Sequence, residues 1–203
     1  MNISDKPWDA RIAYRLVYPL RNTFITPNYL TSLRLLCGII SFVFLSLGEY
    51  IYSNIGALFF VLSNFLDHTD GELARITGNS SKKGHYFDLV SDALVNILLF
   101  LGIGFGLMKT DLGVYAGIMG GIAGLSVAAI FHMRNEIEKQ IGKQMARQPN
   151  KAGVEAEDVL YLLPVVTLLQ LDYYFLFLAC FGAPAFCLWV TKDYFSRKIL
   201  SKI

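Results

Sequence analysis

The chain has 203 residues, of which 54% are hydrophobic, 14% are aromatic and only 17% are charged. Charged residues occupy close to a quarter of the positions in soluble domains, so this composition argues against an ordinary soluble domain. The net charge of +2 gives no indication of a nucleic-acid partner, and three scattered cysteines without a CxxC motif argue against a disulfide framework or a zinc site.

Residues 1–26 are expected to form a cytosolic segment at the membrane interface. Trp8, Ile12 and Leu16 recur at helical spacing, and charged residues occupy the opposite face. This pattern is typical of an amphipathic helix lying in the plane of the interface. A solvated helix has the same periodicity and is the alternative.

The remaining residues, 27–203, are expected to form one transmembrane domain. A transmembrane helix needs about 20 apolar residues, because the hydrocarbon core is about 30 Å thick. We therefore predict an all-α integral membrane protein built as a bundle of six transmembrane helices. The fifth stretch is short and contains Pro164. The six apolar stretches are residues 29–48, 51–75, 85–107, 112–133, 155–171 and 173–192.

Lys and Arg residues predict the orientation of these helices, since cytosolic loops carry an excess of positive charge. With the N-terminus in the cytosol, every Lys and Arg except Lys109 falls on the cytosolic side or in a helix end next to it. Six spans return the C-terminus to the same side. We expect a multi-pass protein of the bacterial cytoplasmic (inner) membrane, with both termini and the connection between spans two and three in the cytosol.

Glycines spaced four residues apart occur in the third and fourth spans. Such GxxxG pairs let two helices approach closely, so we expect them to support helix packing within the bundle. A homodimer face is the second use that this spacing allows. The pairs are Gly102/Gly106, Gly113/Gly117, Gly117/Gly121 and Gly120/Gly124.

Acidic residues interrupt the apolar sequence around the connection between spans two and three. Asp67 and Asp70 are three residues apart in the second span, and each lies on the same helix face as the other. Asp88 and Asp92 are four apart in the third span and also share a face. A short polar turn separates the pairs, which predicts antiparallel neighbouring helices. The four aspartates should therefore converge near the cytosolic surface.

Such a cluster is unfavourable unless cations compensate its charge. Like charges in one site raise one another's pKa values, and an Asp in a membrane helix costs about 2.5–3.5 kcal/mol at the bilayer centre. Oxygen ligands without His or Cys favour Mg²⁺ or a similar ion such as Mn²⁺ or Ca²⁺. The acids therefore predict a metal site for a phosphate or diphosphate substrate, with solvated loop acids or helix caps as the alternative.

Small residues accompany the first acid pair. Gly71 and Ala74 follow Asp67 by four and seven positions, so they share its helix face and leave room for a ligand against the backbone. Arg75 comes next and could pair with an acid or with a phosphate group.

The complete stretch resembles the signature of the CDP-alcohol phosphotransferase family, D-x2-D-G-x2-A-R-x8-G-x3-D-x3-D, with every spacing kept. The matching residues are Asp67, Asp70, Gly71, Ala74, Arg75, Gly84, Asp88 and Asp92. The upstream sequence TPNYLTSLR is similar to the first-helix entry of the same family. Its matching residues are Pro27, Asn28, Thr31 and Arg34.

The resemblance implies transfer of a substituted phosphoryl group from a CDP-linked donor to a hydroxyl acceptor, with release of CMP. CDP-diacylglycerol is the donor we favour, which places the reaction in phospholipid biosynthesis. Two Mg²⁺ or Mn²⁺ ions would be held by Asp67, Asp70 and Asp88, and Asp92 would act as a ligand or as the base. The resemblance implies a CDP pocket formed by Asn28, Thr31, Asp67, Gly71, Ala74, Arg75 and Gly84.

The acceptor alcohol should bind where the fourth and fifth spans meet the cytosol. An anionic acceptor would favour Arg134, and a cationic one would favour Glu157 or Asp158. These residues could also be a snorkelling Arg and acids at a helix N-terminus. The full set of acceptor candidates is His132, Arg134, Asn135, Glu157 and Asp158.

Two other functions also use acidic membrane helices. A membrane prenyltransferase binds Mg²⁺-diphosphate on aspartate-rich helices, but it does not explain Gly71, Ala74, Arg75 and Gly84. A cation transporter predicts acids spread through the membrane depth and an inverted repeat, which we do not find. Cation flux in vesicles without nucleotide would favour the transporter, whereas CMP release would favour the transferase.

Overall fold

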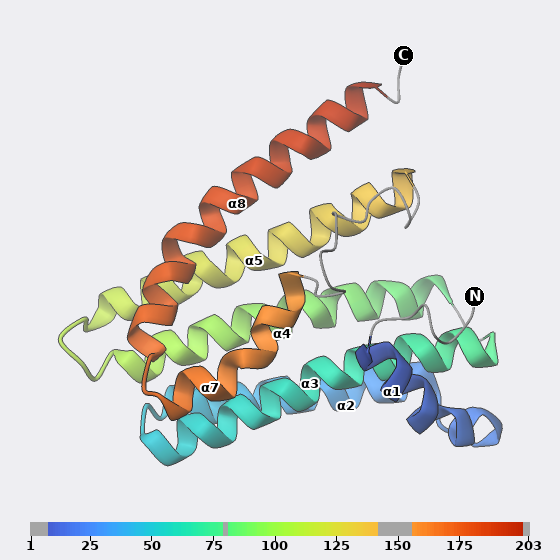
Figure 1. Ribbon diagram of the computed structural model, residues 1–203, viewed down its shortest axis with the longest axis horizontal. Helices are drawn as coiled ribbons and strands as arrows, with labels where there is room; N and C mark the ends of the chain where they lie inside the picture. The colour runs from blue at the N-terminus through green and yellow to red at the C-terminus, as the bar shows by residue number, and fades with distance from the viewer. Residues whose placement is uncertain (1–7, 79–80, 142–155, 201–203) are drawn as a thin grey trace.

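Residues 8–78, 81–141 and 156–200 of a computed structural model are described, and within them every element is helical (Figure 1). The elements in chain order are α1 (Trp8–Val17), the 3-10 helix η2 (Tyr18–Asn22), α2 (Pro27–Ser46), α3 (Tyr50–Thr77), α4 (Lys82–Leu107), α5 (Val114–Ile141), the 3-10 helix η3 (Ala156–Leu162), α7 (Leu163–Leu168) and α8 (Asp172–Leu200).

The long helices form a bundle in which α2 packs against both α3 and α4, α4 against α5, and α5 against α8. Figure 1 shows α2 to α5 side by side along the long axis of the molecule. Their connections are short, so successive helices run in opposite directions. The first turns of α2 and α4 and the last turns of α3 and α5 therefore lie at one end of the bundle, which we call the site end.

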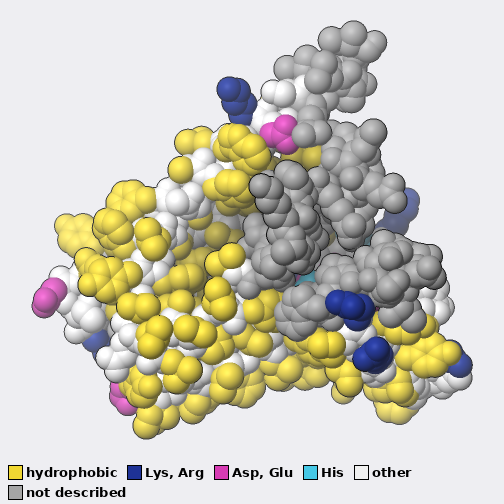
Figure 2. Space-filling view, in the orientation of Figure 1, with side chains coloured by type: hydrophobic (Ala, Val, Ile, Leu, Met, Phe, Trp, Pro, Cys, Tyr) yellow, Lys and Arg dark blue, Asp and Glu magenta, His cyan; other side chains and the backbone are white. Residues whose placement is uncertain are grey.

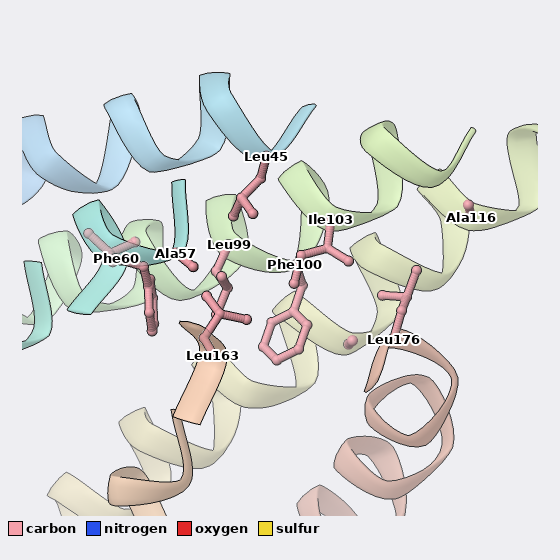
Figure 3. Close-up of a cluster of buried hydrophobic side chains, with 11 residues drawn as sticks. Leu45, Ala57, Phe60, Leu99, Phe100, Ile103, Ala116, Leu163 and Leu176 are labelled. Carbon is pink, nitrogen blue, oxygen red and sulfur yellow. The ribbon is translucent and has the colours of Figure 1, made fainter. Parts of the chain in front are cut away.

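A cluster of buried apolar side chains joins α2, α3, α4, α5, α7 and α8 away from the site end (Figure 3). Leu45, Phe60 and Leu99 belong to it and are at most 2% exposed. Phe100 of α4 stacks on Phe175 of α8, with ring centroids 5.9 Å apart. This packing holds the helices at fixed spacing and so fixes the relative positions of their site ends.

The predicted use of the glycines in helix packing is confirmed for the pairs Gly102/Gly106 and Gly120/Gly124, whereas an added Cβ on Gly113 would meet nothing within 4 Å. A Cβ atom on Gly102 would lie 3.1 Å from the carbonyl oxygen of Phe42 in α2. A Cβ on Gly124 would lie 3.0 Å from Cα of Ile97 in α4. Only glycine permits backbones to approach this closely without displacement of a neighbour.

Four described helices are long and apolar enough to span a membrane. Figure 2 shows hydrophobic side chains covering much of the described surface on one face, as expected where a bundle meets lipid. Helix α3 has 28 residues, enough for a span, but carries more polar side chains than the other four. The count of six spans is not confirmed. The four helices are Pro27–Ser46, Lys82–Leu107, Val114–Ile137 and Asp172–Ser196.

The fifth predicted span is not a continuous helix, because it consists of η3 followed by the six-residue α7. Pro164 stands in the first turn of α7, where its missing N–H is tolerated, and it cannot continue a preceding helix. Gln170, with φ of 55°, follows the end of α7. The segment nevertheless runs beside α3, since Thr167 Oγ1 donates to Asn54 Oδ1 at 2.9 Å.

Helix α1 forms where an amphipathic helix was predicted, and it packs against α3. Ala13 and Val17 make the buried side of α1, whereas Ile12 and Leu16 are 43% and 56% exposed. The exposed apolar side is the one predicted to face the membrane interface. Its location in the interface stays a prediction.

Candidate functional site

The ends of α3 and α4 are set by local sequence signals at the site end. Gly78 ends α3 in the left-handed conformation, with φ of 67°, which glycine adopts without a Cβ clash. Ser81 caps α4 by accepting a hydrogen bond of 3.0 Å from the backbone N–H of Gly84. These signals fix where the two acid pairs stand, Asp67 and Asp70 in α3 and Asp88 and Asp92 in α4.

The expectation that the two acid-bearing helices are direct neighbours is wrong. Within the described residues, α3 and α4 each pack extensively against α2 but scarcely against each other. Helix α2 therefore lies between them at the site, and it contributes its own side chains to the acid cluster. The amphipathic pattern of a helix shows which of its faces is buried, but it does not show that α2 lies between α3 and α4.

Arg34 of α2 is the cation at the centre of the acid cluster. Its Nη1 lies 2.6 Å from Asp67 Oδ1 and 3.2 Å from Asp88 Oδ1. Its Nη2 lies 2.5 Å from Asp92 Oδ1. Arg34 is 0% exposed, and Ser63 of α3 donates to its backbone carbonyl at 2.9 Å. The guanidinium thus joins acids from both helices and holds their carboxylates in place.

Asp70 has a different partner. Thr31 of α2 donates a hydrogen bond from Oγ1 to Asp70 Oδ2 at 2.6 Å, and both residues are buried. Thr31, predicted from resemblance to line the CDP pocket, therefore also orients one of the predicted metal ligands.

Asp67, Asp70 and Asp88 can hold a metal ion together. One carboxylate oxygen from each lies within 4.8 Å of the others. A site made only of carboxylate oxygens suits Mg²⁺ or Mn²⁺, so the residues present fit the expected metal. Asp92 is outside this group of three, and its Oδ1 accepts hydrogen bonds from Arg34 Nη2 and Asn96 Nδ2.

The predicted CDP-pocket residues lie around the same helix ends. A Cβ atom on Gly84 would lie 2.8 Å from Asn28 Oδ1, so glycine at this position lets α2 and α4 approach. Arg75 pairs with the buried carboxylate of Glu72, and its own side chain is 60% exposed. On Gly71 the nearest neighbour of an added Cβ would be the Arg75 guanidinium, at 3.6 Å, and Ala74 is half-buried beside it.

Two cavities meet at Asp92. One, of about 340 Å³, lies between α4 and α5, is mostly apolar, and includes Val90 and His132 in its wall. The other, of about 30 Å³, is polar and lies between α3, α4 and η3. We call the second one the polar niche, and its lining includes Asn64, Asp67, His68, Asp92, Asn96 and Tyr161.

Of the predicted acceptor residues whose side chains the structure describes, only His132 lines a cavity that also contains Asp92. Arg134 and Asn135 lie further along α5 and line neither of the two cavities. The side chains of Glu157 and Asp158 lie outside the described residues.

The predicted site set did not include Arg34 or Asn96. A signal for Arg34 existed, because a charged residue inside an apolar span is by default a functional candidate. Asn96 gave no comparable signal, since a single amide in an apolar stretch is compatible with simple helix packing. Its position one turn beyond Asp92 is informative only once the niche is seen.

Comparison with known proteins yields one family and a small group of relatives. A family model described as CDP-alcohol phosphatidyltransferase matches residues 24–192. A ceramide phosphoethanolamine synthase from Drosophila melanogaster is 35% identical over 92 residues, which are 42% of this chain and 24% of the relative. A bifunctional IPC transferase and DIPP synthase from Archaeoglobus fulgidus is 35% identical over 79 residues, 39% of this chain and 15% of the relative.

A protein of the same description from Thermococcus kodakarensis is 38% identical over 72 residues, 36% of this chain and 16% of the relative. The chain thus spans less than a quarter of the length of these curated relatives.

Proposed function

This chain belongs to the CDP-alcohol phosphatidyltransferase family, and from that premise we propose that it transfers a phosphatidyl group from CDP-diacylglycerol to the hydroxyl of an alcohol, releasing CMP. The observation that carries the proposal is the cluster of Asp67, Asp70 and Asp88 oxygens within 4.8 Å of one another. The names of the relatives, a ceramide phosphoethanolamine synthase and IPC transferases, support group transfer of the same class.

Asp92, Arg34 and Arg75 each have a role in this proposed reaction. Asp92 accepts the proton of the acceptor hydroxyl, whose oxygen forms a bond to the donor phosphorus as the bond from that phosphorus to the CMP oxygen breaks. Arg34 and Asn96 both donate to Asp92 Oδ1, and we assign the proton to Oδ2. Arg34 holds Asp92 in position, and the exposed guanidinium of Arg75 is placed to bind a phosphate oxygen of the nucleotide.

Two Mg²⁺ or Mn²⁺ ions held by Asp67, Asp70 and Asp88 would supply the positive charge that neutralises the diphosphate and the developing charge on the leaving group. The mostly apolar cavity between α4 and α5 suits an acyl chain of the lipid donor, because hydrophobic side chains form most of its wall.

Thr31→Val should weaken Mn²⁺ binding about tenfold, because Asp70 loses the hydrogen bond that orients it and a bond to a charged group contributes about 1.5–3 kcal/mol. Electron paramagnetic resonance titration of the purified protein with Mn²⁺ measures this affinity. Ser46→Ala is the matched control. Ser46 donates to the backbone carbonyl four residues earlier in α2, as Thr31 also does, but it lies away from the acids. Equal affinities in both variants would contradict the role given to Thr31.

The site end is proposed to face the cytosol in a six-span protein whose residues 27–203 form the catalytic domain. The fifth pass would be the shortened segment of η3 and α7, which runs beside α3. We also propose that the protein resides in the bacterial cytoplasmic membrane and that it forms a homodimer.

In a background with Cys37, Cys180 and Cys187 replaced by Ala, Lys83→Cys should react with a membrane-impermeant maleimide only from the cytosolic side. Asp111→Cys should react only from the opposite side, because Asp111 lies at the other end of the bundle and is exposed. Intact cells and inverted vesicles provide the two measurements. The reversed labelling pattern would overturn the orientation.

The function is tested by incubating the purified protein with CDP-diacylglycerol, Mg²⁺ and a panel of alcohols. CMP release that depends on both an alcohol and Mg²⁺, with a product mass equal to the phosphatidyl alcohol, is the expected result. Absence of CMP release with every alcohol, or cation flux in vesicles without nucleotide, would count against the proposal.

A further inference from the structure

Asn96 has a side chain that the proposed reaction does not yet use. It stands on α4 one turn beyond Asp92 and is 2% exposed. Its Nδ2 donates to the backbone carbonyl of Asp92 at 3.0 Å and to Asp92 Oδ1 at 3.4 Å. Both of these atoms are acceptors, so the amide must turn its nitrogen towards them.

The amide oxygen of Asn96 is consequently directed away from Asp92. Among the residues that the structure describes, Oδ1 has no hydrogen-bond partner although it is buried. A buried acceptor without a donor is unfavourable, and native proteins rarely keep one unless something binds to it. Asn96 also lines the polar niche together with Asp67 and Asp92.

The niche is large enough to hold a small polar group. A water-sized group needs about 10–15 Å³ when volume is measured in this way, and the niche offers about 30 Å³. It therefore has room for a small polar group such as a hydroxyl or an amino group. Asp92 lines the niche, so a group bound there would lie next to the residue that takes the proton in the proposed reaction.

We propose that Asn96 Oδ1 accepts a hydrogen bond from a second donor group of the acceptor alcohol, a hydroxyl or an ammonium next to the hydroxyl that reacts. The reacting hydroxyl has one proton, and Asp92 takes it. The donor for Asn96 must therefore be another group of the same molecule. This inference rests on the proposed transferase function and adds the residue, Asn96, that recognises the second donor group of the acceptor.

Asn96 is thus a specificity-determining residue. A site built to bond a substrate hydroxyl or amine rejects an analogue that lacks the group, because the buried polar atom is then left without a partner. A residue with a merely structural role would lower turnover for all acceptors equally.

The experiment compares acceptor pairs that differ only in the second donor group. Glycerol 3-phosphate is paired with 3-hydroxypropyl phosphate, serine with 3-hydroxypropanoate, and ethanolamine with ethanol. CMP release gives kcat/KM for each compound with CDP-diacylglycerol and Mg²⁺. The pair to be analysed is the one that contains the acceptor with the highest kcat/KM. For this pair, the wild-type kcat/KM should be at least about tenfold higher for the compound with the second donor group than for the compound without it. In Asn96→Leu this preference should fall to within about twofold of unity.

Two further variants serve as controls for this experiment. Asn96→Ala, which removes the amide with less bulk, should lose the preference in the same way. Asn54→Leu, which alters a comparable amide of α3 far from the acids, should keep it. Unchanged preference in both Asn96 variants, or a wild-type enzyme that uses both members of the pair equally, would overturn the inference while leaving the transferase function intact. Absence of CMP release from every pair would instead overturn the transferase function and this inference with it.

Discussion

Asp92→Asn should lower kcat by at least about 10²-fold, because a positioned general base contributes about 10²- to 10⁴-fold. Asparagine keeps the shape of the side chain and can still accept a hydrogen bond from Arg34, but it cannot take up the acceptor proton. Since oxygens of Asp67, Asp70 and Asp88 lie close enough together to hold a metal ion without Asp92, binding of CDP-diacylglycerol in Mg²⁺ should stay within about tenfold. CMP release and lipid-nucleotide binding are measured on the same preparation.

Asp70→Asn provides the contrast, because it removes a charge from the group of three acids. It should weaken Mn²⁺ binding and donor binding together. Near-normal turnover of Asp92→Asn would mean that another group accepts the proton of the acceptor hydroxyl. A parallel loss of donor binding in Asp92→Asn would instead make Asp92 primarily a metal ligand.

Arg34→Met should destabilise the folded protein by about 3 kcal/mol, because removing one partner from a buried ion pair costs about 3–5 kcal/mol. We take the lower end because the side chains of Asp67, Asp88 and Asp92 are 33–39% exposed and water screens them in part. The expected fall in Tm is about 6–12 °C for a chain of this length. Thermal unfolding in detergent measures it.

Added Mg²⁺ should raise the Tm of Arg34→Met more than that of the wild type, since the acids of the variant have lost their own cation. Arg34→Lys should recover only part of the stability, because an ammonium cannot bond three carboxylates in the fixed geometry of a guanidinium. Arg21→Met serves as the control, as Arg21 is exposed and lies 4.0 Å over the ring of Tyr18. A Tm for Arg34→Met equal to that of the control would mean that the acids do not need Arg34.

Local sequence signals were sufficient for much of the site. The three- and four-residue spacings of the aspartates predicted one face on each helix, and three of the four do meet closely enough for one metal ion. Ser81 and Gly78, which fix the turn between the helices, act through their own backbone and nearest neighbours. Such features depend on residues close in the chain, so a single sequence is enough to see them.

The position of Arg34 among the acids depends on residues far apart in the chain. Arg34 is 33 residues from Asp67 and reaches the acids only because α2 lies between α3 and α4. No periodicity in any one helix encodes that order. The apolar run around Pro164 looked like a span because hydropathy averages over a window, whereas the proline starts a new helix at Leu163.

As the proposed fifth pass, the shortened segment of η3 and α7 would also affect how the protein fits its bilayer. Seven residues of 3-10 helix and six of α-helix rise about 23 Å together, against about 30 Å for the hydrocarbon core. A hydrophobic mismatch of this size is relieved by local thinning of the bilayer or by polar side chains reaching outwards, at fractions of a kcal/mol per Å. Thinning beside α3 would bring the headgroup layer down towards Asp67 and Asp92, so short-chain lipids should favour the geometry in which a polar alcohol and a lipid-bound nucleotide meet.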